Sequence, residues 1–371
     1  QTTTTVTDDN SIGGGGSSSG RRQVALAPMA GHHPWMVRLA FNVSRWSPTR
    51  DEWMLANALV HRSETERVAA FVFKRDAKAA MAGRLLIRRC VVDSLGWSNA
   101  ALNIGRTSEG RPRIMWPDDA GTDADDGRPH HHFDFNVSHQ GHYSVLAASP
   151  HCQRIGIDVM QRRYTGGRPI AEFFRLMRRQ FTPDEWRYIE APDEIRRQVA
   201  RFYRLWTLKE SYVKAVGVGL AMDLQRINFR VCDELRPPPP VLELTSTRLE
   251  LDGQPADEWT FHECLLDSEH CVAIASSGRL QQRRDDEGIT TTTTTTTAAT
   301  TTMTTTTTMT TKTTAEPHTA GHSPASALGP YTQLDFSQLV AGLERRDELN
   351  SSELTELWEQ FCVKKERPQC G

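Results

Sequence analysis

A carboxylate and an ammonium group four residues apart, Glu210 and Lys214, are the first candidates for chemistry in this sequence. Residues at positions i and i+4 of a helix lie one above the other on the same side, so this spacing predicts that the two groups act from one face. A carboxylate beside a cation could hold a metal ion and the phosphate that the ion neutralises. An isolated pair with this spacing is usually a solvated surface ion pair, and that alternative stays open at this point.

Asp158 is the candidate partner for Glu210, because one acidic group rarely holds Mg²⁺. It lies in residues 154–160, where β-branched residues alternate with Gly156, Asp158 and Met160. This alternation predicts a strand with one apolar face. Asp158 should then point away from that face, beside a glycine that leaves room for a ligand. The alternative is an aspartate that forms a turn or caps a helix.

The element that must position Glu210 and Lys214 is a helix that begins near Arg201. Large apolar side chains recur at spacings of three and four from Phe202 onward, which is typical of an amphipathic helix. Gly217 and Gly219 follow, as glycines commonly do just past a helix end. The apolar, tryptophan-containing surface of this helix indicates that the pair lies near a protein wall rather than in open solvent.

These segments together resemble the bipartite signature of the 4′-phosphopantetheinyl transferases. The signature consists of residues 156–158 (Gly-Ile-Asp) and residues 206–214 (Trp-Thr-Leu-Lys-Glu-Ser-Tyr-Val-Lys). Further matches stand in the right order at residues 71–84, 135–141 and 216–220, and a weaker similarity follows near residues 331–339. The chain is most similar to the aminoadipate-semialdehyde-dehydrogenase type of transferase found in animals.

The resemblance implies an α+β fold of two similar α/β halves, related by a pseudo-twofold axis, with the active site in the cleft between them. The order of strands and helices before Asp158 is roughly repeated after it, which agrees with this expectation. The implied reaction moves the 4′-phosphopantetheine group of coenzyme A to a serine of acyl carrier protein domains, such as those of fatty acid synthase. Adenosine 3′,5′-bisphosphate leaves, and Mg²⁺ is required.

The resemblance assigns the catalytic roles to Asp158, Glu210 and Lys214. Both carboxylates would hold Mg²⁺, Glu210 would act as the base, and Lys214 would stabilise developing charge. Many bacterial relatives have a second acid where this chain has Met160, and a thioether is too soft to bind Mg²⁺, so the third metal ligand stays unidentified. The expected contacts to coenzyme A are Arg67, Arg106, Thr107, Ser108, Glu109, Gly110, Arg111, Asn136, Val137, Ser138, His139, Asp158, Glu210, Ser211 and Lys214.

Ordinary structural roles are also open for several of these residues. His139 could be a hydrogen-bonded imidazole of the core, and residues 102–113 could form a simple basic hairpin. Basic residues of a helical region usually form a solvated face, and we expect that of most members of one set: Arg67, Lys74, Arg75, Lys78, Arg84, Arg88 and Arg89. A capping box is expected at residues 63–66, where the pattern is Ser-Glu-Thr-Glu.

The expected organisation is a transferase body flanked by low-complexity segments. Residues 34–155 and 156–277 are the two expected halves. Threonine-, glycine- and serine-rich residues 1–33 and 278–330 are expected to be disordered, and residues 117–132 are expected to form a surface loop. Residues 331–371 regain an apolar pattern and predict a helical segment that docks back or meets a partner.

Composition favours a cytosolic, monomeric protein that binds neither nucleic acid nor membrane. The net charge is −2, and no apolar run approaches the length of a membrane span. The sequence shows no signal peptide at its start, and its seven cysteines are scattered, which favours reduced thiols. Two rival functions stay open, namely a non-catalytic module that binds a nucleotide or coenzyme A, and a scaffold acting through the threonine tract and the final helix.

Overall fold

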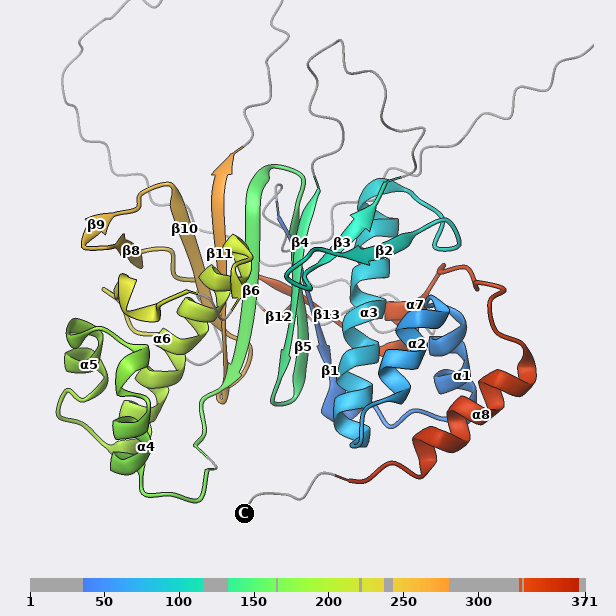
Figure 1. The fold of residues 1–371 in the computed structure, drawn as a ribbon, viewed down its shortest axis with the longest axis horizontal. Helices are drawn as coiled ribbons and strands as arrows, with labels where there is room; N and C mark the ends of the chain where they lie inside the picture. The colour runs from blue at the N-terminus through green and yellow to red at the C-terminus, as the bar shows by residue number, and fades with distance from the viewer. Residues whose placement is uncertain are drawn as a thin grey trace, which may run out of the picture.

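The computed structural model describes residues 36–116, 133–164, 166–219, 222–236, 243–279, 327–328 and 330–366. Two β-sheets lie near the middle of the molecule, with one group of helices on either side of them (Figure 1). The predictions for residues 1–33 and 117–132, and nearly all of the prediction for residues 278–330, lie outside the described residues.

The first sheet has five strands in the order β12-β13-β1-β5-β4. Strand β1 pairs antiparallel with β5 and parallel with β13, which comes from the far end of the chain. The strands are β1 (Val37–Asn42), β4 (Asp134–Gln140), β5 (Tyr143–Ser149), β12 (Ala327–Leu328) and β13 (Tyr331–Leu334). A 3₁₀ turn of residues 43–45 ends β1, and the helices near this sheet follow it: α1 (Arg50–Ala58), α2 (Arg62–Ala69) and α3 (Lys74–Leu95).

The second sheet has three strands in the order β10-β11-β6 and supports the longest helix of its half, α6 (Ile195–Val216). Its strands are β6 (Cys152–Gln161), β10 (Trp259–Leu265) and β11 (His270–Arg279). Nearby helices are α4 (Ile170–Leu176) and α5 (Pro183–Ile189), with 3₁₀ turns at residues 178–180 and 224–226. Two small sheets complete the fold: β2 (Asn103–Arg106) with β3 (Pro112–Met115), and β7 (Ile227–Arg230) with β8 (Arg248–Leu251) and β9 (Gln254–Pro255).

Side chains, rather than a backbone ladder, join the two large sheets where β4 lies against β6. Every second residue of β4 faces β6 because side chains alternate along a strand. The acceptors Asp134 Oδ2, Asn136 Oδ1 and Gln140 Oε1 receive hydrogen bonds from the backbone N–H groups of Ile155, Ile157 and Gln161, at 2.8, 3.0 and 2.6 Å respectively. Polar side chains of β4 therefore accept hydrogen bonds from the backbone N–H groups at the edge of β6.

The apolar core is divided into three clusters. One packs α3 against the first sheet, and a second packs α6 against the second sheet. The third covers the opposite face of both sheets and contains Ile155, Ile157 and Val159, all with no exposed area. This confirms the predicted alternation in β6, since Asp158 points to the other side, toward α6.

The C-terminal segment packs on the helices of the first half. After β13, helix α7 (Phe336–Val340) and helix α8 (Ser351–Cys362) run along α3 and α1. The ring of Phe361 stacks on Trp53 with centroids 4.0 Å apart, and the Trp53 indole N–H donates to the carbonyl of Leu357 at 3.3 Å. The sequence pattern indicated helix alone here, whereas part of the segment is strand β13.

Two expectations about the first helical region are wrong. The N-cap of α2 is His61, which forms a capping box with Glu64, so the box lies two residues before the expected residues 63–66. Of the seven basic residues expected mostly on a solvated face, only Arg67 is exposed. Arg88 has no exposed area because it pairs with Glu64 and donates to Asn99, so this helix carries charge into the core.

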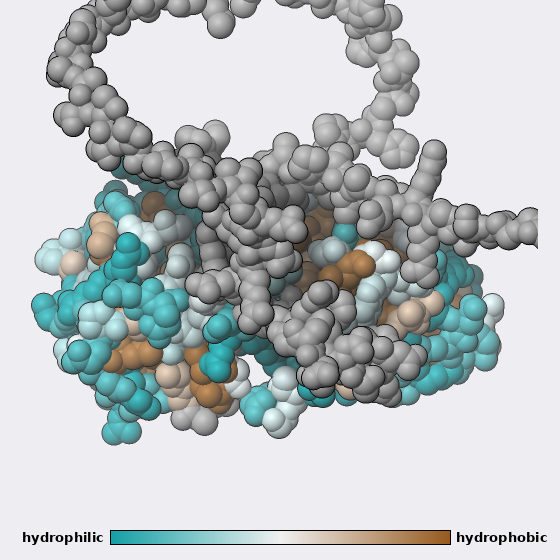
Figure 2. Space-filling view, turned by 90° about the horizontal axis from the view of Figure 1, so that it is seen from above, coloured by the Kyte–Doolittle hydropathy of each residue, from teal (hydrophilic) through white to brown (hydrophobic). Residues whose placement is uncertain are grey.

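No helix within the described ranges is long and apolar enough to cross a membrane. Figure 2 shows hydrophilic residues over much of both sides of the visible face, with smaller hydrophobic areas between them. Singly exposed apolar residues of this kind are normal for a folded protein.

Candidate active site

An ion pair between Lys214 and Asp158 joins α6 to β6 at the place where β4 also arrives. Lys214 Nζ lies 2.6 Å from Asp158 Oδ1 and donates to Ser138 Oγ at 2.8 Å, and the Ser138 hydroxyl lies 2.8 Å from the same carboxylate oxygen. Three segments distant in sequence therefore meet through three side chains. Lys214 pairs with Asp158 and not with its helical neighbour Glu210, which the i,i+4 spacing alone did not distinguish.

Gly156 permits this contact by letting α6 lie directly on β6. A Cβ atom at Gly156 would come within 2.1 Å of the Ser211 carbonyl oxygen and 2.4 Å of the Ala215 backbone nitrogen. Only glycine fits such a close approach of helix and strand. The expectation that Gly156 leaves room for a ligand is thus wrong, since helix backbone fills that space.

Glu210 lines a cavity of ≈ 580 Å³ beside the ion pair. Lys214, Arg111, Asn136 and Val137 also line it, together with an apolar wall made by Trp206, Val213, Met222 and Leu224. Burial raises the pKa of Glu210, the negative charge of Asp158 raises it further, and Lys214 opposes both effects. The carboxyl group is therefore closer to neutrality than a solvated glutamate.

Asp158 and Glu210 form a donor set that fits a divalent cation. Asp158 is buried, its Oδ2 atom has no hydrogen-bond donor among the described residues, and its charge acts on Glu210. A cation between two carboxylates would satisfy that oxygen and relieve their repulsion, and Mg²⁺ favours few carboxylates with several waters. No group of three or more His, Cys, Asp or Glu residues that could hold a metal occurs in the described part of the chain.

Arg111 of the β2–β3 hairpin joins elements rather than pointing free into solvent. Its NH2 group lies 2.8 Å from both carboxylate oxygens of Asp134 and donates to the carbonyl of Ile155 at 2.7 Å. Its NH1 group donates to the carbonyl of Lys214 at 3.2 Å. The guanidinium thus ties β4, β6 and the end of α6 together at the margin of the cavity.

A cluster of cations from the first half lies within electrostatic reach of Lys214. Burial lowers the pKa of Arg84, Glu64 opposes the change, and the positive charges of Arg106 and Arg67 lower it further. The Nε atom of Arg84 is buried and has no hydrogen-bond partner among the residues described, and its nearest carboxylate oxygen is Glu64 Oε1 at 4.0 Å. His139 is partly exposed. The loss of hydration around its ring lowers its pKa, and the positive charge of Lys214 lowers it further. Concentrated positive charge and a free donor suit phosphate groups.

Sequence reasoning did not single out Arg84, although it named Arg67, Arg106 and His139. Its position within a run of basic helix residues resembles that of a solvated arginine, and only the tertiary structure places it among the other cations. The signal available in the sequence was its location between Gly83 and Leu85, two residues without polar side chains.

The remaining expected contacts divide between the hairpin and the core. Thr107 Oγ1 accepts from the backbone N–H of Arg111 at 3.2 Å, and Ser108 donates to Glu109 at 2.6 Å. Thr107 and Glu109 line a neighbouring cavity of ≈ 750 Å³, and the Gly110 turn has a φ of 86°. Ser211 is not brought to the site: it has no exposed area, and its hydroxyl donates to the Leu208 carbonyl at 2.8 Å.

Comparison with protein families identifies two adjoining matches. Residues 44–151 match the model described as "4'-phosphopantetheinyl transferase, N-terminal", and residues 154–275 match the "4'-phosphopantetheinyl transferase superfamily". The boundary between the matches falls just after β5 and just inside β6. The first match therefore covers α3 with strands β4 and β5 of the five-stranded sheet, and the second covers α6 with most of the three-stranded sheet.

Named proteins from distant organisms are similar over the same part of the chain. The human L-aminoadipate-semialdehyde dehydrogenase-phosphopantetheinyl transferase is 43% identical over 243 residues, which are 64% of this chain and 74% of the human protein. A phosphopantetheinyl transferase of Thraustochytrium is 36% identical over 258 residues, or 67% of this chain and 79% of that protein. A 4′-phosphopantetheinyl transferase of Bacillus subtilis is 31% identical over 179 residues, or 48% of this chain and 69% of that protein. With these matches, and with Asp158 and Glu210 on neighbouring elements beside one cavity, the chain belongs to the 4′-phosphopantetheinyl transferase superfamily.

Proposed function

We propose that this transferase moves the 4′-phosphopantetheine group of coenzyme A to a serine hydroxyl of an acyl carrier protein domain. The new bond joins the serine oxygen to the phosphorus of that group, and the bond from this phosphorus to the leaving adenosine 3′,5′-bisphosphate breaks. The observation that carries the proposal is the arrangement of Asp158, Glu210 and Lys214 beside one cavity.

Each of these three residues has a defined part in the proposed reaction. Glu210 accepts the serine proton, and its raised pKa brings it nearer to the operating pH, where a general base is most effective. Lys214 donates to the phosphoryl oxygens where negative charge develops. Magnesium, when held by Asp158 and Glu210, supplies neutralising charge for the pyrophosphate. Ser138 holds Asp158 and Lys214 in position, because its hydroxyl group bonds to both side chains.

The phosphates of coenzyme A are assigned to the cationic cluster near Lys214, and its pantetheine arm is assigned to the cavity. Arg67, Arg84, Arg106 and His139 supply positive charge for the phosphates, and the apolar wall that includes Trp206 suits the uncharged pantetheine arm. The hairpin of residues 103–115 lies along the nucleotide in this proposal. Arg111 contributes by holding that hairpin on β4 and α6.

The finer expectations about architecture and cell biology are also part of the proposal. Helices α3 and α6 both have 22 residues, and each packs on one of the large sheets, which supports two similar halves with the site in a cleft between them. We assign the protein to the cytosol as a monomer, acting on carrier domains such as those of fatty acid synthase. The name of the human relative, an L-aminoadipate-semialdehyde dehydrogenase-phosphopantetheinyl transferase, supports a role for a second carrier, in lysine metabolism.

Intact-mass spectrometry tests the proposed reaction directly. The full chain is incubated with coenzyme A, Mg²⁺ and an apo acyl carrier protein, alongside a carrier whose acceptor serine is replaced by alanine. The proposal expects the mass of the phosphopantetheine group to be added to the first carrier and not to the second. Tight binding of coenzyme A without any added mass would instead support the non-catalytic binding module.

A further inference from the structure

A second cavity, of ≈ 460 Å³, lies at the opposite end of α6 from the proposed active site. Its lining includes Arg197 near the start of the helix, whereas Glu210 lies 13 positions further on. At about 1.5 Å per helical residue this separates the two positions by roughly 20 Å along the axis. The cavity is therefore a distinct site, and none of the coenzyme A contacts assigned above lies in it.

Six arginines line this cavity: Arg162, Arg196, Arg197, Arg201, Arg204 and Arg236. The charges of two of them are balanced by carboxylates of the protein. Arg204 makes a bidentate ion pair with buried Glu263, with N–O distances of 2.6 and 2.8 Å, and Arg201 pairs with Asp193. Such pairs hold a guanidinium in place but leave little charge for a ligand.

The charges of the other four arginines are not balanced by a close carboxylate. Arg197 has a loose contact of 3.7 Å with Asp193, which already serves Arg201. Arg162, Arg196 and Arg236 have no carboxylate within ion-pairing distance among the residues that the structure describes. Glu194 and Glu234 also line the cavity, but both are exposed at its margin. The cavity therefore keeps a surplus of positive charge.

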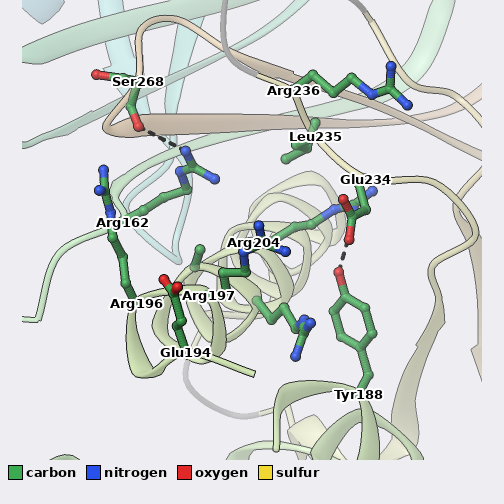
Figure 3. Close-up of a pocket in the computed structure, with 12 residues that line it drawn as sticks. Arg162, Tyr188, Glu194, Arg196, Arg197, Arg204, Glu234, Leu235, Arg236 and Ser268 are labelled. Carbon is green, nitrogen blue, oxygen red and sulfur yellow. Dashed lines mark hydrogen bonds between the residues drawn. The ribbon is translucent and has the colours of Figure 1, made fainter. Parts of the chain in front are cut away.

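Arg162 is the most buried of these four arginines. Its NH2 group donates to the carbonyl of Ser268 at 2.8 Å, while its Nε atom is buried and lacks a hydrogen-bond partner in the described structure. Arg162 and Arg196 lie on one side of the cavity, opposite Tyr188 and Glu234 (Figure 3). Burial lowers the pKa of Arg162, and the positive charges of Arg196 and Arg204 lower it further, whereas Cys271 and Asp267 oppose the change. A buried donor among like charges is a costly arrangement that an anion would relieve.

We propose that this cavity binds a small phosphate-bearing molecule at a site separate from the coenzyme A cavity. Planar guanidinium groups bind phosphate oxygens in pairs, and several of them around one hollow match a group of two or more negative charges. The volume lies within the range of small-molecule sites. The site is concave and its unpaired donor lies deep inside it. A small anion can reach that donor, whereas the broad surface of a partner protein cannot. The proposal does not depend on the transferase reaction.

Calorimetric titration of the full chain with inorganic pyrophosphate at low ionic strength tests this site. The variants are Arg162→Gln at depth and Arg196→Gln at the exposed rim. Arg187→Gln is the matched control, since Arg187 is an exposed arginine of α5 outside the cavity. Lys214→Ala reports any pyrophosphate bound at the other cavity. We expect a binding event that Lys214→Ala and Arg187→Gln leave unchanged and that each cavity variant weakens roughly ten- to a hundredfold, separate from any event that Lys214→Ala abolishes.

Melting temperatures recorded in parallel show whether each variant is folded. If Arg162→Gln does not fold, the exposed Arg196→Gln and Arg236→Gln variants carry the test. Affinities of these two variants within about twofold of the Arg187→Gln control would overturn the proposal. It would also be overturned if pyrophosphate produced no such event while an acidic carrier domain bound in a manner that required Arg196, because the cavity would then be a protein docking site.

Discussion

Two lysines of helix α6, Lys209 and Lys214, each pair with a carboxylate, yet their surroundings differ in every other respect. The pair of Lys209 and Glu185 is sealed: neither side chain has any exposed area, and the N–O distance is 2.9 Å. In the pair of Lys214 and Asp158, the lysine side chain is 30% exposed and borders a cavity. The same chemical pair therefore occurs once inside the fold and once at an accessible surface.

The sealed pair has no bonding capacity left. Lys209 donates to Glu185 and to the carbonyls of Leu224 and Ile227, both at 2.6 Å, which uses its three N–H groups. Glu185 also accepts from the backbone N–H groups of Thr182 and Phe229. Burial lowers the pKa of the lysine and raises that of the glutamate, and each charge opposes the shift of the other. This pair joins α5, α6 and β7 and is structural.

The open pair keeps capacity for a ligand. Asp158 retains a buried oxygen without a donor among the described residues, and Lys214 has two side-chain acceptors for three N–H groups. Glu210, one turn before Lys214, adds a carboxyl group whose pKa is raised by burial and by Asp158. The difference shows that unsatisfied groups beside a cavity, rather than the presence of an ion pair, mark the site of chemistry.

The largest expected effect is the loss of transfer when a carboxylate of the open site is removed. Asp158→Ala and Glu210→Ala should each lower the rate on the order of a thousandfold, because several kcal/mol of transition-state stabilisation is lost. Both variants should remain folded. The rate of carrier modification and the melting temperature are the two measurements. Turnover within about tenfold of the wild type in either variant would reject the assignment of that carboxylate.

Removing the carboxylate of the sealed pair should damage the fold instead. Glu185→Ala leaves Lys209 buried without its partner and should cost about 3–5 kcal/mol of unfolding free energy. Denaturant titration measures this cost. The double variant Glu185→Leu/Lys209→Met is the control, since replacing both charges by apolar groups removes the unpaired cation and should recover much of the loss. Equal losses in the single and double variants would contradict a structural ion pair.

A methyl group at Gly156 should disturb the open pair and spare the sealed one. The added Cβ atom of Gly156→Ala would overlap the Ser211 carbonyl at 2.1 Å, so α6 must move away from β6. Such overpacking costs about 1–3 kcal/mol, and the shift separates Lys214 from Asp158. Denaturant titration and the carrier assay should both register the change. An unchanged rate in this variant would mean that the spacing of Lys214 and Asp158 is not critical.

The smallest expected effect concerns acid stability at the contact between β11 and the turn that joins β4 to β5. Asp267 holds His270, whose Nε2 atom accepts from the backbone N–H of His142 at 3.1 Å. Burial raises the pKa of Asp267, but hydrogen bonds from His270 and from the backbone N–H of Glu269 outweigh it and bring the value to about 2. Because the folded pKa lies below the unfolded value of about 3.9, this contribution is present above pH 4 and fades toward pH 2.

Asp267→Asn should therefore melt below the wild type at neutral pH and converge with it as the pH falls toward 2. Asp267 is 37% exposed, so the difference should not exceed about 1 kcal/mol. Melting curves at several pH values measure it. A gap that widens on acidification would contradict the depressed pKa. The stability contributions of the Lys209 and Lys214 pairs serve for comparison, since neither pair includes Asp267.

Local pattern was enough to predict the elements that hold the site. The alternation of residues 155–159 gave the direction of Asp158 correctly, and Gly217 ends α6 in the left-handed conformation with a φ of 81°. A local pattern of the same kind, a threonine before a proline, starts α5, where Thr182 is the N-cap and Pro183 the first residue. Each of these features depends on residues close together in sequence, where periodicity and capping are decisive.

Features set by distant residues could not be predicted in the same way. Arg88 is buried because Glu64 lies 24 positions earlier, and β13 pairs with β1 across nearly the whole chain. Ser138 was expected to contact coenzyme A, whereas the structure also shows its hydroxyl between Asp158 and Lys214. Only tertiary packing determines such partners, so sequence reasoning could name the side chains but not their contacts.

A side-by-side measurement of Lys209→Met and Lys214→Met tests the central claim most directly. For each variant, the unfolding free energy and the rate of carrier modification per folded molecule are determined. The account predicts that Lys214→Met loses at least about a hundredfold in rate with less than half the stability loss of Lys209→Met. Lys209→Met should retain a near wild-type rate in its folded fraction. The opposite pattern, with rate preserved in Lys214→Met and lost in folded Lys209→Met, would contradict the account.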